Sequence, residues 1–184
     1  MKIRFLLIVL LGIFLVGGCV TAPSKSEKKE GANKNIKTYT ADLNGDGGKE
    51  IVETEDRFNA DSVSVITVKK QVKKKKIPET IDSVLVSGKI KKLDFIELIP
   101  DGGKKMAVYF DGKDNFSNIV IYQLQNDKLS MMFAASSLYG IDAQFAPNMP
   151  RIKIGKLPSR AKDSPNIVPE WDTWVWTGDK FIKD

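Results

Sequence analysis

Short apolar runs with a period of two fill the chain from residue 36 onward, and they constrain the fold more than any other feature. Ser62–Val68 and Trp174–Trp176 show the clearest alternation of side chains, which is typical of half-buried β-strands. Gly, Asn, Asp and Pro separate the runs, and no stretch has the pattern of a long amphipathic helix. The pattern predicts an all-β, mostly antiparallel fold. We expect strands at 36–42, 49–54, 62–69, 83–88, 92–98, 105–110, 117–124, 128–134, 140–145, 150–155, 172–177 and 180–183.

Two motifs recur at nearly the same spacing. Asp46–Val52 reads DGGKEIV, and Asp101–Ala107, 55 residues later, reads DGGKKMA. Segment 122–129 likewise matches 175–181 as strand, tight turn and strand, about 52–53 residues apart, and a weaker third unit starts at 146. The offsets predict about three blade-like units of roughly 50 residues, each a four-stranded sheet. Three blades are too few for a closed ring. We therefore expect an open array or one that closes by self-association, with a single β-sandwich as the alternative.

The segment Asp42–Glu50 (DLNGDGGKE) concentrates oxygen donors in one turn. Asp42, Asn44 and Asp46 stand at positions 1, 3 and 5, Gly48 offers a backbone carbonyl at position 7, and Glu50 adds a carboxylate at position 9. Alternating oxygens in a tight loop can surround one hard cation with about six to eight ligands, which suits calcium better than magnesium. We expect these five residues to bind one structural calcium ion.

This loop resembles the calcium loops of FG-GAP repeats, found in integrin α-subunits and in bacterial VCBS-type repeat proteins, where a similar pattern leads into an apolar strand. It also resembles an EF-hand, with Glu53 at position 12. An EF-hand, however, has an apolar residue where this chain has Lys49, and a helix on each side. In the second, degenerate copy Ile99 and Lys105 replace the ligands at positions 3 and 9. The FG-GAP resemblance implies calcium in the first loop and a purely structural second loop. The remaining alternative is a metal-free glycine-rich turn.

The first 18 residues have the three parts of an export signal: a positively charged start, the apolar run Phe5–Val16, and small residues before a cleavage point. The run is short for a transmembrane helix, which needs about 20 apolar residues. Val16–Cys19 (VGGC) resembles the bacterial lipobox, in which signal peptidase II cleaves before the cysteine and the thiol carries lipid. The resemblance implies a lipid (palmitate) anchor on Cys19.

The lipobox sets the expected organisation and location of the chain. A signal peptide (1–18) is followed by the lipidated Cys19 and a polar, flexible tether (19–35), and then by the folded domain 36–184. Val20, rather than Asp, follows the cysteine. In a Gram-negative cell this resembles sorting to the outer membrane, facing the periplasm. In a Gram-positive cell it implies the outer face of the plasma membrane.

Composition excludes several classes of chemistry. The chain has no His and one Cys, which removes imidazole catalysis, internal disulfides and multi-cysteine metal sites. The net charge of +6 falls to +4 once residues 1–18 are removed. We expect this small excess of positive charge to favour solubility and to attract the protein to anionic lipid or cell-wall polymer. We expect no nucleic acid partner. No catalytic signature is present. A carboxylate pair of the kind that glycosidases use remains the enzymatic alternative.

Two further features allow a binding or a structural interpretation. Trp171, Trp174 and Trp176 form either a ligand surface for sugar or peptide or part of the core. Residues 69–76 hold six lysines, which either contact anionic polymers or form a solvated turn.

The sequence therefore predicts a membrane-anchored envelope lipoprotein. Its body would be a non-catalytic binding or scaffold module with one structural calcium ion, and its partner would be a protein or a cell-wall polymer. The alternatives are a metal-free envelope β-sandwich that binds other proteins, and a secreted carboxylate-dependent hydrolase.

Overall fold

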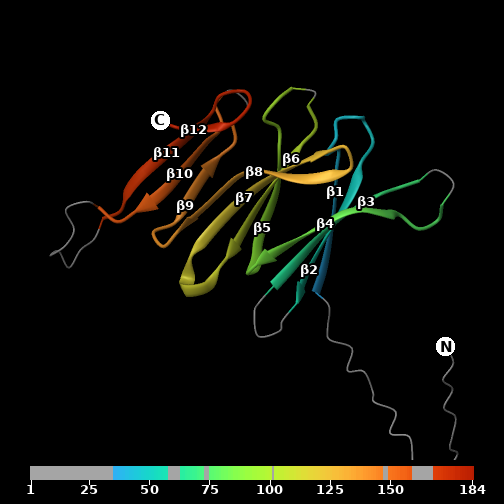
Figure 1. The fold of residues 1–184 in the computed structure, drawn as a ribbon, viewed down its shortest axis with the longest axis horizontal. Helices are drawn as coiled ribbons and strands as arrows, with labels where there is room; N and C mark the ends of the chain where they lie inside the picture. Colours follow the sequence, from blue (N-terminus) through green and yellow to red (C-terminus); the bar gives the residue numbers. More distant parts are fainter. Residues whose placement is uncertain (1–34, 58–62, 73–74, 101, 147–148, 159–167) are drawn as a thin grey trace, which may run out of the picture. The chain divides into compact units, whose positions relative to one another are not determined.

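Strands in a computed structural model of the protein form three four-stranded antiparallel sheets (Figure 1). The structure describes residues 35–57, 63–72, 75–100, 102–146, 149–158 and 168–184. All of them belong to one unit, Asn33–Asp184.

Neighbouring strands in each sheet follow one another along the chain. The first sheet contains β1 (Asn35–Ala41), β2 (Glu50–Arg57), β3 (Val63–Lys70) and β4 (Glu79–Ser87). The middle sheet contains β5 (Lys89–Ile96), β6 (Lys105–Asp111), β7 (Ser117–Gln125) and β8 (Lys128–Ser137), with a short 3-10 turn, η1 (Lys113–Asn115), between β6 and β7. The third sheet contains β9 (Ile141–Gln144), β10 (Arg151–Lys156), β11 (Glu170–Trp176) and β12 (Phe181–Lys183).

The predicted fold class is confirmed. The described part of the chain is all-β and antiparallel, contains no α-helix, and is divided into three four-stranded, blade-like sheets with no closed barrel. Among these residues no helix is long and apolar enough to cross a membrane.

Local sequence explains the hairpins. Asn126 and Asp127 adopt φ values of 52° and 58° between β7 and β8, and these left-handed conformations match the twist of a two-residue hairpin. Gly88 connects the first sheet to the middle sheet with φ of 153°. A methyl group there would lie 1.9 Å from the carbonyl oxygen of Asp111, so only glycine fits.

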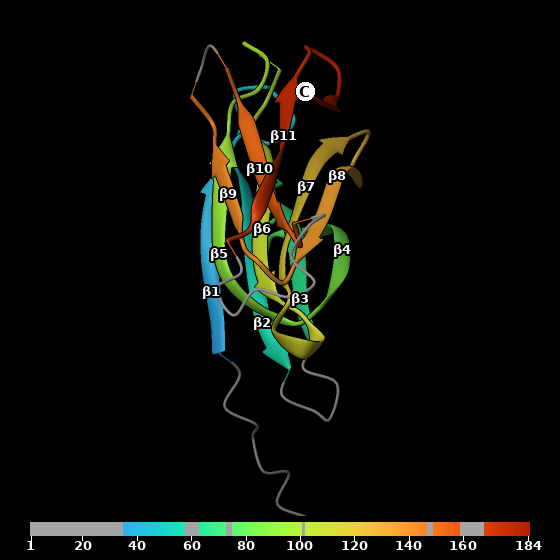
Figure 2. The ribbon, with the colours of Figure 1, turned by 90° about the vertical axis from the view of Figure 1, so that its left-hand side faces the viewer.

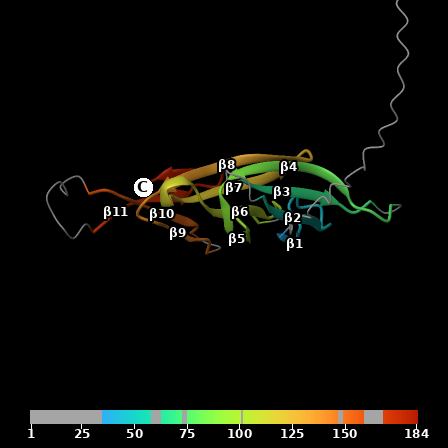
Figure 3. The same ribbon diagram turned by 90° about the horizontal axis from the view of Figure 1, so that it is seen from below.

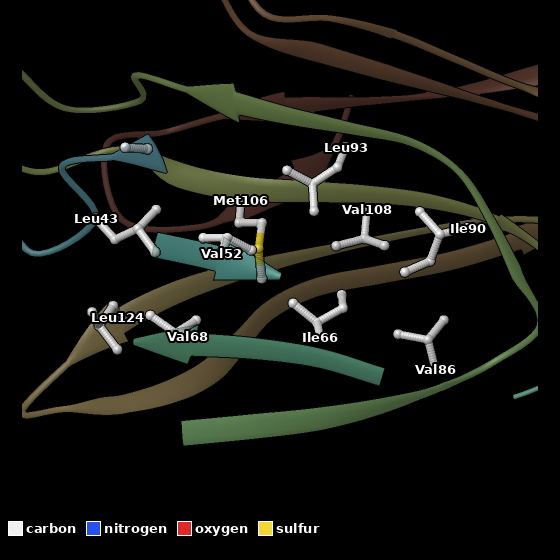
Figure 4. Close-up of a cluster of buried hydrophobic side chains, with 11 residues drawn as sticks. Leu43, Val52, Ile66, Val68, Val86, Ile90, Leu93, Met106, Val108 and Leu124 are labelled. Carbon is white, nitrogen blue, oxygen red and sulfur yellow. The ribbon is translucent and has the colours of Figure 1, made fainter. Parts of the chain in front are cut away.

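Both faces of the middle sheet are buried. One face packs on the first sheet, where Val52, Ile66 and Val68 meet Met106 and Val108 (Figure 4). All five of these side chains are at most 1% exposed. The alternation of side chains along β6 and β7 sends the intervening residues to the opposite face. That face packs on the third sheet in a second cluster, formed by Ile96, Leu98, Ala107, Ile119, Ile121, Phe133, Ile152 and Phe181.

The outward face of the first sheet is mixed: charged residues lie on it beside the apolar Ile51, Val65 and Leu85. Glu53 and Glu55 alternate with the buried Val52 and Thr54 and form ion pairs with Lys69 and Arg57. The residue 55 positions after Glu53 is the fully buried Val108. Charged residues at such a position oppose the stacking of a further sheet on this face.

Equivalent elements of the three sheets lie on the same side. In Figure 3 the first strands, β1, β5 and β9, follow one side of the row, and β4 and β8 follow the other. Figure 2 looks along the row, with the third sheet, in orange and red, nearest the viewer. The two loops that carry DGGK motifs, between β1 and β2 and between β5 and β6, both lie at the upper edge of Figure 1.

Candidate metal-binding loop

The predicted calcium loop connects β1 to β2. The chain leaves β1 at Ala41 and enters β2 at Glu50. Gly45 and Gly47 have φ values of 78° and 81°, a left-handed conformation that favours glycine and lets the loop reverse within a few residues. Apart from Leu43, which is 1% exposed and packs into the core, the loop lies at the surface.

Side chains of the loop organise its backbone. Asp42 accepts hydrogen bonds from the Gly45 amide at 2.7 Å and the Gly47 amide at 2.9 Å, one on each carboxylate oxygen. Asn44 Oδ1 accepts from the Asp46 amide at 2.9 Å. The carboxylate and amide oxygens therefore sit on the inside of the turn, where they replace the missing backbone partners.

Asp46 has three partners. Its Oδ1 accepts from the Gly48 amide at 2.7 Å, and its Oδ2 accepts from Asn44 Nδ2 at 3.0 Å and from Lys70 Nζ at 3.2 Å. The Gly48 amide, the Asn44 side chain and the Lys70 ammonium all favour the charged carboxylate and lower the pKa of Asp46. Asp46 is therefore an ionised group that already attracts one cation.

Glu50 is buried, with 1% of its surface exposed. Its Oε2 accepts from the Leu43 amide at 2.9 Å, which ties the end of the loop to its beginning. The five predicted ligand positions, from Asp42 to Glu50, thus lie in one turn, and Glu50, like Asp42 and Asp46, accepts a hydrogen bond from a backbone amide.

The second loop, which follows β5, packs directly on the first. The Lys104 amide donates to the Asp42 carbonyl at 2.8 Å. Gly103 has φ of 70°, and a methyl group there would lie 2.6 Å from both the Gly45 nitrogen and the Leu43 oxygen. The sequence shows the two loops as copies, but the contact between them was not predicted. Their common offset of 55 residues could have indicated it, because equivalent loops of adjacent blades lie side by side.

An open pocket of about 340 Å³ lies between the two loops. It is lined by Asp42, Gly45, Gly47, Glu97, Gly103 and Lys104. Asp42 and Glu97 occupy position 1 of their respective copies, so the junction places one carboxylate from each blade at the same opening.

Position 9 differs in charge between the copies. Lys105, which stands where the first copy has Glu50, is 5% exposed, and its Nζ donates to the Gly102 carbonyl at 2.6 Å. Burial lowers the pKa of this lysine. Asp101, at position 5 of this copy, lies outside the described residues.

The donor set of the first loop fits a hard cation, because every predicted ligand is an oxygen. In the described ranges, no three acidic side chains already converge as a metal cage. The carboxylate oxygens instead bind amides. A carboxylate oxygen accepts more than one hydrogen bond or metal contact, so an amide on one side leaves its other lone pair available. The residues therefore fit calcium by chemistry, provided that Asp46 exchanges Lys70 for the ion.

The three tryptophans do not share one surface. Trp174 and Trp176 pack toward the middle sheet, with ring centroids 5.5 Å from Phe133 and 5.2 Å from Phe181, respectively. Trp171 is 45% exposed and lies on the other face of β11, because its position alternates with theirs. Trp171 is therefore the most exposed of the three, whereas Trp174 and Trp176 are half-buried against the middle sheet.

Comparison with known proteins adds no family. No protein-family model matches the chain, and no curated protein matches it significantly. The resemblance to FG-GAP repeats consequently rests on the loop residues and their place between the first two strands of a sheet.

Replacing Gly103 by alanine tests the contact between the loops. Alanine at a left-handed position costs about 1–2 kcal/mol. At Gly103 the methyl group also collides with the first loop, and overpacking adds about 1–3 kcal/mol. Gly47→Ala is the matched control, since its φ is similar and no atom lies within 4 Å of the added carbon. Urea denaturation should show the larger loss for Gly103→Ala, and equal losses would contradict the packed junction.

Proposed function

We propose that the protein is an exported lipoprotein whose folded body acts as a non-catalytic binding or scaffold module of the bacterial envelope. The export signal, the VGGC motif and the polar tether support this proposal. These segments, 1–34, lie outside the described residues, so the anchor on Cys19 rests on sequence. The tether gives the body reach from the membrane.

A calcium ion in the first loop is the second part of the proposal. One observation carries it: Asp42, Asn44, Asp46, Gly48 and Glu50 lie in a single turn at the junction of two blades, and the side-chain oxygens of the four polar residues accept hydrogen bonds from backbone amides. Calcium would neutralise carboxylates that otherwise repel one another. Asp42, Asn44 and Asp46 would hold it with side-chain oxygens, and Gly48 with its carbonyl. Glu50 would contribute its second carboxylate oxygen while keeping the Leu43 amide.

A metal-free binding module is the rival. The Lys70–Asp46 ion pair favours it, because an ammonium group already neutralises part of the loop. In both versions the body recognises a protein or an anionic cell-wall polymer through its exposed surface, where Trp171 and the lysines of the β3–β4 turn are the candidate contacts.

Lipid attachment can be tested directly. Cells that express the full chain should incorporate labelled palmitate into it, and the protein should sediment with membranes. Cys19→Ser removes the only thiol in the chain and should abolish the label. Label that persists in Cys19→Ser, or an unlabelled wild-type protein, would exclude the proposed anchor.

Thermal unfolding tests the calcium site. Free calcium at about 1 mM fills even weak extracellular sites, and binding to the native state alone should raise Tm by about 3–8 °C relative to EDTA. Asp46→Asn should lose this increase, because the amide keeps an acceptor for Gly48 but no charge. Asp142→Asn, on the exposed surface of β9, should retain it. An unchanged wild-type Tm would support the metal-free module.

A further inference from the structure

Two lysines at the end of β3 point to opposite faces of the first sheet and form ion pairs with different carboxylates. Lys69 Nζ lies 2.6 Å from Glu53 Oε2 on the outward face. Lys70 Nζ lies 3.2 Å from Asp46 Oδ2 in the candidate calcium loop. The neighbouring turn continues with further lysines, so the ion pair attaches a strongly basic segment to the loop.

The Lys70–Asp46 pair is open to solvent. The two side chains are 44% and 47% exposed. An ion pair at this exposure is held weakly, because water and salt screen it.

The second loop has an internal ammonium group of a different kind. Lys105 is 5% exposed and donates to the carbonyl of Gly102 in its own loop. Lys105 stands at position 9, where the first copy has the carboxylate of Glu50. Because the side chain is buried, dissolved ions have little access to its ammonium group. The ammonium group at the first loop therefore comes from Lys70 on a neighbouring strand and lies at the surface. The ammonium group of the second loop belongs to Lys105 in that loop itself and is buried.

We propose that Lys70 is an exchangeable counter-ion that competes with calcium for Asp46, and that Lys105 permanently takes the place of a cation in the second loop. This inference rests on the proposed calcium site. Calcium in the first loop would carry two positive charges close to Asp46, and it would repel the Lys70 ammonium. Binding would therefore detach Lys70 from the loop and leave it with the exposed lysines of the β3–β4 turn. The second loop would bind no ion.

Calorimetric titration of calcium chloride into the full chain in neutral detergent tests this competition. Lys70→Met should bind calcium about threefold to tenfold more tightly than wild type, because it removes an exposed competitor and a nearby positive charge. Lys69→Met is the matched control, since it removes the same charge from the adjacent residue but from a pair outside the loop. Its affinity should stay within about twofold of wild type.

The stoichiometry and the unfolding curves separate the outcomes. One ion per chain supports the role of Lys105, and two would overturn it. Equal affinities for Lys70→Met and Lys69→Met, with calcium still bound by wild type, would overturn the competition and leave the calcium site standing. A wild-type chain that binds no calcium would overturn both. Melting curves in EDTA establish that each variant is folded, and Lys70→Gln provides a second variant if Lys70→Met does not fold.

Discussion

Both faces of the middle sheet are buried in hydrophobic packing, and the arrangement of the other two sheets depends on this. Along β6, Met106 and Val108 face the first sheet while Ala107 faces the third, and all three are at most 1% exposed. A strand buried on both sides must have neighbours on both sides. The first sheet needs only one apolar face, and it turns Glu53 and Glu55 outward.

The same packing brings the loops of adjacent blades together. Once the first and middle sheets stack, their first connections meet at one edge, where Lys104 and Gly103 hold the backbone of the Asp42 loop. The first loop is thus supported by its own side chains and by a neighbouring repeat. A cation bound there would act on the junction between two sheets rather than on one turn. This is the physical basis for proposing a structural ion, and for assigning Lys70 a part in controlling it.

Much of the fold could be predicted, because alternation of side chains and glycine-rich turns act locally. Each expected strand overlaps one in the structure, and the repeat offset predicted the blades. The errors come from tertiary contacts. We expected the fourth strand to begin at 83, but it begins at Glu79, because Glu79 and Thr80 continue the pairing with Lys70 and Lys69 beyond a β-bulge. We expected the fifth strand at 92, but Gly88 permits a connection so short that it begins at Lys89. The placement of the candidate ligands in one loop follows from their spacing in the sequence, and their binding of calcium stays a prediction. The burial of Glu50 and Lys105 depends on packing.

Hydrogen exchange at the Lys104 amide, compared in EDTA and in calcium, tests the central claim most directly. This amide belongs to the second loop and donates to the carbonyl of Asp42, so additional protection at this position reports on the junction. The account predicts exchange slowed by about tenfold or more in calcium, a larger effect than at the Ile182 amide in the distant third sheet. Equal exchange at Lys104 under both conditions would show that the first loop does not use calcium to join the two blades.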